Sequence, residues 1–186
     1  MRYSQIRKLD ISDGPGCRVG FYTQGCHFHC KGCFNSDTWN FSGGKLYTDE
    51  VKNMILEYCS PFYIKGLSIL GGEPLSPENK DEILNLVKSF KEKYKDKTIW
   101  VWSGYEYENL DDWQLEILKY CDVLVCGQFV EEEKDLTRKY AGSKNQRVVD
   151  LKTGSIIKDW TSVQIWYLFD WTKEQLLVYL KIQKGW

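Results

Sequence analysis

Three cysteines near the start of the chain have the residue type and spacing to bind a metal centre. Cys26, Cys30 and Cys33 form a Cys-x3-Cys-x2-Cys loop that is otherwise polar and rich in glycine. Thiolates are soft ligands, which select iron–sulfur clusters, zinc or copper over hard ions. Three cysteines on one short loop can hold three irons of a cubane 4Fe–4S cluster and leave the fourth iron open, whereas four cysteines would close it. The loop therefore predicts a centre at which a substrate can bind.

Zinc is the alternative for this loop. His27 and His29 lie between the first two cysteines, so a Cys3His structural zinc site in a non-catalytic binding module also fits the spacing. We otherwise expect both histidines to face solvent and to influence the centre indirectly. The four remaining cysteines show no disulfide spacing and are interpreted as small buried hydrophobes: Cys17, Cys59, Cys121 and Cys126.

A second motif follows the apolar stretch Leu67–Leu70. Gly71 and Gly72 permit positive backbone φ angles and close approach of the backbone to a ligand. The carboxylate of Glu73 beside them can accept a charge-assisted hydrogen bond from an ammonium group. A structural zinc site gives no reason for such a turn, so this motif favours the iron–sulfur interpretation.

The elements that position these motifs alternate between strands and helices. The sequence predicts strands at Ile6–Ile11, Val19–Thr23, Leu67–Leu70, Thr98–Trp102 and Val123–Cys126, with helices near 51–58 (capped by Thr48), from Ser76-Pro77 to Phe90, and over Asp112–Tyr120. This order is typical of βαβ units with a parallel sheet and right-handed crossovers. Four such units or fewer cannot close an eight-stranded barrel, so we predict an α/β fold with an open partial (β/α) barrel. In such folds chemistry lies at the carboxyl ends of the strands, where both motifs fall.

The C-terminal part has a different pattern. Arg147–Leu151 and Ser155–Lys158 flank a Lys-Thr-Gly turn and predict a β-hairpin. An aromatic tail then leads to Thr172, which opens a predicted amphipathic helix that stops at Gly185. We therefore predict a main domain over residues 1–150 and a C-terminal extension over 151–186 packed on it.

Composition limits the class of protein. A length of 186 residues suits one domain with a sizeable core, and the 42% hydrophobic and 27% charged content is that of an ordinary soluble protein. The net charge of -1 argues against a nucleic-acid-binding surface. The sequence shows neither an apolar signal region nor a run of transmembrane length, and its cysteine usage suits a reducing compartment. We expect a cytoplasmic protein that binds neither nucleic acid nor membranes.

The cysteine loop and the Gly-Gly-Glu turn together resemble the radical S-adenosylmethionine enzymes. This resemblance implies that S-adenosylmethionine chelates the open iron, and that an electron from the reduced cluster cleaves it to methionine and a 5′-deoxyadenosyl radical. It implies that Gly71, Gly72 and Glu73 hold the methionyl amine, and that Ser103 and Gly104 bind the ribose. Phe34 would pack on the adenine, with the backbone of Gly32 to Phe34 reading its edge. Many members carry an aromatic residue where Gly32 stands here.

Further stretches resemble one subfamily, the glycyl-radical-enzyme activases that serve anaerobic ribonucleoside-triphosphate reductases. They are Asp13-Gly14-Pro15-Gly16 with Arg18, Cys33-Phe34-Asn35 with Asp37-Thr38-Trp39, Trp100–Tyr105, Val123-Leu124-Val125 with Gly127 and Phe129-Val130, and Gly142-Ser143 with Asn145-Gln146. The resemblance spans roughly residues 10–151. It implies an oxidoreductase that generates a glycyl radical on the reductase, with flavodoxin or ferredoxin as electron donor. Two alternatives stay open: activation of another glycyl radical enzyme, and radical modification of a small molecule.

Overall fold

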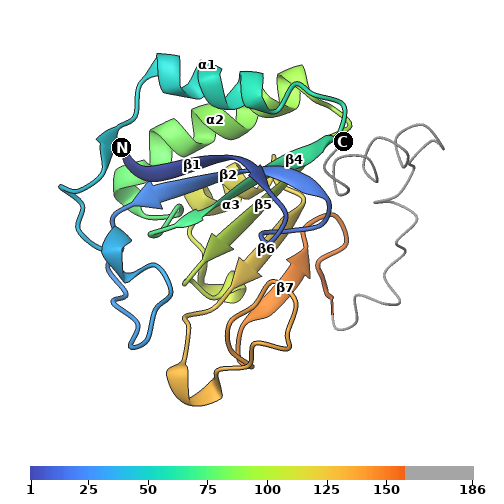
Figure 1. The fold of residues 1–186 in the computed structure, drawn as a ribbon. Helices are drawn as coiled ribbons and strands as arrows, with labels where there is room; N and C mark the ends of the chain where they lie inside the picture. The colour runs from blue at the N-terminus through green and yellow to red at the C-terminus, as the bar shows by residue number, and fades with distance from the viewer. Residues whose placement is uncertain (158–186) are drawn as a thin grey trace, which may run out of the picture.

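The computed structural model of the chain describes residues 1–157, which build one mixed eight-stranded sheet with helices packed against it (Figure 1). The strand order across the sheet is β3-β1-β2-β4-β5-β6-β7-β8. The strands are β1 (Arg2–Asp10), β2 (Cys17–Gln24), β3 (Lys45–Leu46), β4 (Ile64–Gly71), β5 (Thr98–Ser103), β6 (Val123–Cys126), β7 (Arg147–Asp150) and β8 (Ser155–Ile156). The α-helices of the described part are α1 (Asp49–Tyr58), α2 (Lys80–Lys93) and α3 (Asp112–Leu118).

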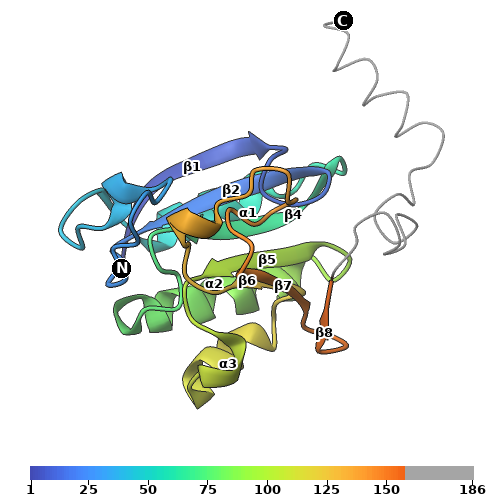
Figure 2. The ribbon, with the colours of Figure 1, turned by 90° about the horizontal axis from the view of Figure 1, so that it is seen from below.

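The centre of the sheet consists of parallel strands joined by helices. β2, β4, β5 and β6 lie next to one another in chain order, and α1, α2 and α3 connect them in turn. Because successive strands are neighbours and crossovers are right-handed, all three helices are expected on one face of the sheet. Figure 2 shows α3 on one side of β5 and β6 and the segment after β6 on the other. The predicted βαβ units are confirmed here.

The hydrophobic core follows this division into two faces. Ile55 of α1, Phe90 of α2 and Ile117 of α3 belong to one large buried cluster that also contains Val101 of β5. Side chains alternate across a strand, so the residue beside Val101 points the other way. That residue, Trp100, belongs to a smaller apolar cluster on the opposite face. The helix-covered face therefore holds most of the core and leaves the other face for the site.

The outer strands differ from the prediction of a parallel sheet. β1 pairs antiparallel with β2, β7 with β6, and β8 with β7. The connection between β1 and β2 covers only residues 11–16, which is too short for a parallel crossover. The predicted C-terminal hairpin is confirmed as β7–β8. The sheet is consequently mixed, with a parallel centre and antiparallel edges.

Two helix starts show how local sequence sets the element boundaries. The Thr48 hydroxyl accepts a hydrogen bond from the Val51 N–H at 3.4 Å, which confirms the predicted cap of α1. The second helix was predicted to begin at Ser76-Pro77, but α2 begins at Lys80 after a 3-10 turn over Pro77–Asn79. The Asn79 side-chain amide donates to the carbonyl of Glu73 at 2.9 Å, so this turn is held against the end of β4.

The predicted aromatic tail over residues 160–171 and the predicted helix from Thr172 lie outside the described residues. Within residues 1–157, none of the helices combines the length and the apolar character needed to cross a membrane. The β8 strand pairs with β7, so the beginning of the predicted C-terminal extension shares the sheet of residues 1–150.

Candidate functional site

A cavity of about 670 Å³ lies where the parallel strands end, on the face of the sheet opposite the helices. It is lined by most residues that the two motifs single out, namely Cys26, Cys30, Cys33, Phe34, Gly71, Gly72, Glu73, Ser103 and Gly104. Gly32 does not line it. The structure thus brings together side chains from three strand ends and from the cysteine loop, as expected for the carboxyl edge of a parallel sheet.

The cysteine loop is fixed by backbone hydrogen bonds at its start. The Gly25 N–H donates to the Thr38 carbonyl at 2.7 Å, and the Cys26 N–H donates to the Trp39 carbonyl at 3.1 Å. The Gly25 carbonyl in turn accepts the Glu73 N–H at 2.8 Å. These bonds join the cysteine loop to the turn after β4. The two sequence motifs are therefore one local structure, although they lie far apart in the chain.

At least one backbone N–H group lies beside each of the three sulfur atoms. The Asn35 N–H donates to the Cys33 sulfur at 3.4 Å. Phe28 and His29 favour the Cys26 thiolate through their N–H groups, whereas burial, the larger effect, raises the pKa of this thiol. Burial likewise raises the pKa of the Cys30 thiol, against a smaller opposite effect of the Phe129 N–H. Hydrogen bonds to sulfur are among the contacts that tune iron–sulfur clusters.

The donor set fits a cluster held by thiolates. Within residues 1–157, no three His, Cys, Asp or Glu side chains already stand together as ligands of a metal ion, so the fit rests on the residue types, the N–H donors and the shared cavity. Three soft sulfur ligands on one cavity wall are the chemistry that an iron–sulfur cluster requires.

The two histidines of the loop do not complete a zinc site. His27 lies 2.8 Å from the Glu78 carboxylate and packs on the Phe41 ring. His29 stacks on the Trp39 ring. Both imidazoles are exposed, as predicted, and neither lines the cavity that the cysteines share. The structure gives no support to the Cys3His alternative.

Glu73 links the turns that follow β4 and β5. Its side chain is only 2% exposed, and its carboxylate accepts hydrogen bonds from the Leu75 N–H, the Ser103 hydroxyl and the Gly104 N–H at 2.8, 2.8 and 2.7 Å. Burial raises the pKa of this carboxyl to about 7, even though these three donors favour the charged form. Both oxygens of Glu73 are thus already used within the protein.

The glycines of this edge are needed for contacts between protein segments. A Cβ added to Gly72 would lie 2.3 Å from the Gly25 carbonyl oxygen. A Cβ added to Gly104 would lie 2.5 Å from the Phe28 ring. The sequence predicted close approach to a ligand at the Gly-Gly-Glu turn, and the structure adds that the cysteine loop itself makes the close approach. Glycine at these positions lets the loop pack on the strand ends.

The segment between β6 and β7 folds back over the cysteine loop and contributes cavity residues that the sequence reasoning did not select. The Phe129 ring lies 5.1 Å from the Phe34 ring, and the Lys134 ammonium lies 5.1 Å from the Phe34 ring centre. Phe34 is nevertheless 58% exposed. Gly32 contacts this segment instead of the cavity, because its Cβ would lie 2.8 Å from the Glu131 carboxylate. The signals for this contact were the resemblances at Phe129-Val130 and at Gly142-Ser143, since Gly142 also packs on the rings of Phe34 and Phe129.

A buried arginine orders the opposite end of the cavity. The fully buried Arg18 guanidinium donates to the Ser68 hydroxyl at 2.7 Å and to the Leu67 carbonyl at 2.8 Å, and burial lowers its pKa to about 10. The Ser68 hydroxyl donates in turn to the backbone carbonyl of Asp13. The Asp13 carboxylate accepts the Tyr22 hydroxyl at 2.6 Å, and both side chains line the cavity. Asp13, the first residue of the Asp-Gly-Pro-Gly turn, is therefore part of the cavity wall.

Comparison with known proteins agrees with this site. Residues 12–149 match the family described as "4Fe-4S single cluster domain". The chain is 43% identical over 150 residues to the anaerobic ribonucleoside-triphosphate reductase-activating protein of Enterobacteria phage T4, covering 80% of this chain and 93% of the relative. It is 42% identical to the protein of the same name from Vibrio cholerae (78% and 96% covered) and 37% identical to that of Escherichia coli K12 (82% and 100% covered).

These relatives are matched over nearly their whole length, and the 4Fe-4S family covers both the cysteine loop and the strand ends that form the cavity. The chain belongs to the family of anaerobic ribonucleoside-triphosphate reductase-activating proteins and contains a 4Fe-4S single cluster domain.

Proposed function

We propose that this protein is a radical S-adenosylmethionine enzyme that activates an anaerobic ribonucleoside-triphosphate reductase by generating a glycyl radical on it. One observation carries the proposal: the three cysteines and the Gly-Gly-Glu turn line the same cavity and are joined by a backbone hydrogen bond. Relatives that are 37–43% identical to it over the aligned residues bear the name of the reductase-activating protein.

Cys26, Cys30 and Cys33 are the residues that would hold the cluster. Bound together, the cluster and S-adenosylmethionine would supply the 5′-deoxyadenosyl radical that abstracts hydrogen from the target glycine. The cavity of about 670 Å³ is within the size range of small-molecule sites, and its wall mixes apolar and polar groups.

The turn after β4 supplies backbone groups for the methionyl amine of S-adenosylmethionine. The Glu73 carboxylate already accepts three hydrogen bonds from the protein. We therefore assign it the main role of holding this turn in shape, and direct contact with the amine is its second role. Gly71 and Gly72 line the cavity beside it. Glu73 acts by keeping the ends of β4 and β5 in register.

The remaining cofactor contacts lie on two other parts of the wall. Ser103 and Gly104 would bind the ribose, although the Ser103 hydroxyl already donates to Glu73. Phe34 would pack on the adenine, for which its exposed ring on the cavity wall is suited. Gly32 has no side chain and does not line the cavity, so the backbone groups beside it, those of Cys33 and Phe34, would read the adenine edge from the cavity wall.

The finer architecture that we propose is an open partial barrel of the radical S-adenosylmethionine type. It is supported by the run of neighbouring parallel strands and by the three helices that pack on a single face of the sheet. An incomplete barrel leaves a lateral opening, which suits a flexible peptide loop of a large protein substrate. We also propose that residues 1–150 form the catalytic domain, that 151–186 extend it, and that flavodoxin or ferredoxin delivers the electron.

The proposal is tested by activation of the reductase. The anaerobically reconstituted protein, mixed with S-adenosylmethionine, reductant and the large reductase subunit, is expected to give the doublet of a glycyl radical in electron paramagnetic resonance and to release 5′-deoxyadenosine. Cys30→Ala should give neither. Release of 5′-deoxyadenosine without a doublet on the reductase would reject the assigned partner, and a colourless zinc protein would reject the chemistry.

A further inference from the structure

Trp39 carries a buried donor without an acceptor. Within the part of the chain that the structure describes, two buried side-chain polar atoms lack a hydrogen-bond partner, the indole nitrogen of Trp39 and the hydroxyl of Tyr47. Trp39 lines the cavity of the three cysteines, and Tyr47 does not. Buried polar groups in native proteins nearly always have a partner, so an unpaired one at a site calls for a specific explanation.

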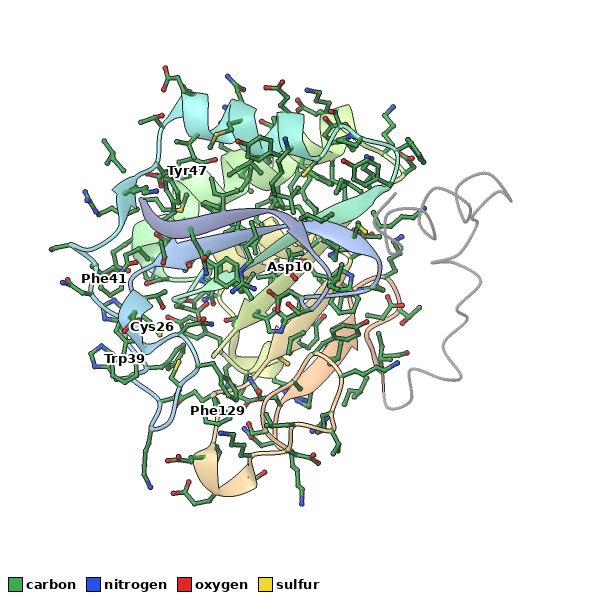
Figure 3. The ribbon with its side chains drawn as sticks, viewed as in Figure 1. Asp10, Cys26, Trp39, Phe41, Tyr47 and Phe129 are labelled. Carbon is green, nitrogen blue, oxygen red and sulfur yellow. The ribbon has the colours of Figure 1, made fainter. Side chains whose placement is uncertain are left out.

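The position of Trp39 points to the cysteine loop. Its carbonyl accepts the Cys26 N–H at 3.1 Å. Its ring stacks on the imidazole of His29, with 4.8 Å between the ring centres and 20° between the planes. Figure 3 shows Trp39 close to Cys26 on the same side of the molecule. The indole therefore lies against the segment that carries the cysteines.

A second tryptophan of the same cavity gives the contrast. The Trp102 indole also lines the cavity, but its N–H donates to the Tyr140 carbonyl at 2.8 Å. An indole N–H can only donate, so Trp39 requires an acceptor and Trp102 already has one. Sulfur atoms of a thiolate-bound cluster are acceptors, and Cys26, Cys30 and Cys33 place them at this wall.

We propose that the Trp39 indole N–H donates a hydrogen bond to a sulfur atom of the cluster, which makes Trp39 a positioning and tuning residue. This inference rests on the cluster of the proposed function. A donor to a cluster sulfur stabilises the reduced, more negative state, and hydrogen bonds to the sulfurs are one of the terms that set the reduction potential. Trp39 raises the potential of the cluster and so eases its reduction by the electron donor.

The first test compares reduction potentials of cluster-loaded variants in the absence of S-adenosylmethionine. Trp39→Phe keeps the aromatic ring and removes the N–H, so its midpoint potential should shift below that of the unmodified protein. Trp102→Phe is the matched control from the same cavity, and its potential should stay at the unmodified value. An unshifted potential in Trp39→Phe with a full iron load overturns the inference.

The second test keeps Trp39, and it decides the question should Trp39→Phe fail to load. Because the label enters every tryptophan, the Trp102→Phe variant, which lacks the other indole of the cavity wall, is grown with tryptophan that is ¹⁵N-labelled at the indole nitrogen, loaded, reduced and studied by pulsed electron paramagnetic resonance. A ¹⁵N coupling to the cluster without S-adenosylmethionine is expected. A coupling that is absent, or that arises only when S-adenosylmethionine is added, overturns the inference. Iron content and visible absorption report separately whether the cluster itself is present, which is the claim of the proposed function.

Discussion

The two faces of the sheet are built from the same strands but by different rules. On the helix-covered face, aliphatic and aromatic side chains such as Ile69 and Phe90 form one continuous core. On the cavity face, Arg18 and Glu73 are almost fully buried, and each is held by several named hydrogen bonds. Burial stabilises the first face through removal of apolar surface from water, while on the second face it demands a partner for each polar group. Substitutions should therefore cost stability on one face and function on the other.

The largest contrast is expected between two cysteines. Cys30→Ala, on the cavity face, should abolish cluster assembly and S-adenosylmethionine cleavage while leaving the fold largely intact. Cys59→Ala, in the helix-covered core, should keep both and lower the free energy of unfolding by about 1 kcal/mol, as for a small core truncation. Iron analysis, 5′-deoxyadenosine assays and thermal unfolding provide the comparison. Retained cleavage in Cys30→Ala would refute its assignment as a ligand.

The next largest effect falls on the core. Phe90 is fully buried on α2, so Phe90→Ala should lower the free energy of unfolding by about 3–5 kcal/mol. Below its melting temperature the variant should still assemble the cluster, since Phe90 lies on the face away from the cavity. Denaturant unfolding and iron content measured on the same sample check both parts. Normal stability would show that the two faces are not divided as described.

Glu73→Ala is expected to affect the cofactor more than the cluster. The substitution leaves the Leu75 N–H, the Ser103 hydroxyl and the Gly104 N–H without their acceptor, which loosens the turn where S-adenosylmethionine would bind. We expect its dissociation constant to rise by about tenfold, equal to about 1.4 kcal/mol, with iron content unchanged. Equilibrium binding by calorimetry under anaerobic conditions measures this. Unchanged affinity would remove Glu73 from the site.

A pH dependence of stability is expected at the same residue. Glu73 has its pKa raised from 4.5 to about 7 by burial. Between these values the folded protein keeps the proton and the unfolded chain releases it, so rising pH lowers the free energy of unfolding. Glu73→Gln does not titrate and serves as the reference.

The unfolding free energy of the unmodified, cluster-free protein, taken relative to that of Glu73→Gln, should therefore fall as pH rises from 4.5 towards 7. It should level off above the folded-state pKa of Glu73. Urea unfolding at several pH values measures this difference. A difference that does not change with pH would mean that the carboxyl is not buried as the structure describes.

Local signals were sufficient for the central fold and for expecting the three cysteines and the Gly-Gly-Glu turn to meet at the strand ends. The apolar run ending at Leu70 and the cap at Thr48 each lie within a short window, and the structure confirms the strand and the helix that they predict. β1 begins at Arg2, whereas the predicted strand began at Ile6. The first residues of β1 lack an apolar run, so the sequence contains no signal for them. Its antiparallel pairing follows from a short connection, which the sequence reasoning did not use.

Contacts between segments that are distant in the chain could not be predicted from the sequence. The sequence around Glu73 does not indicate that its carboxylate accepts a hydrogen bond from the Ser103 hydroxyl, because that bond depends on how β4 and β5 align. The packing of Phe129 on Phe34 joins the segments that follow β6 and β2, which are not neighbouring strands in the sheet. The unpaired N–H of Trp39 can likewise be recognised only in the folded structure, where the positions of all possible acceptors are known. Spacing predicts which residues can do chemistry, and tertiary structure decides how each is restrained.

The most direct test of the account asks whether S-adenosylmethionine binds at the cluster in this cavity. S-adenosylmethionine labelled with ¹⁵N at its methionyl amine is added to the anaerobically loaded, reduced protein, and electron–nuclear double resonance is recorded. The account predicts a ¹⁵N coupling to the cluster in the unmodified protein. A loaded protein that binds S-adenosylmethionine without such a coupling would contradict the claim that three cysteines leave an open iron beside the Gly-Gly-Glu turn.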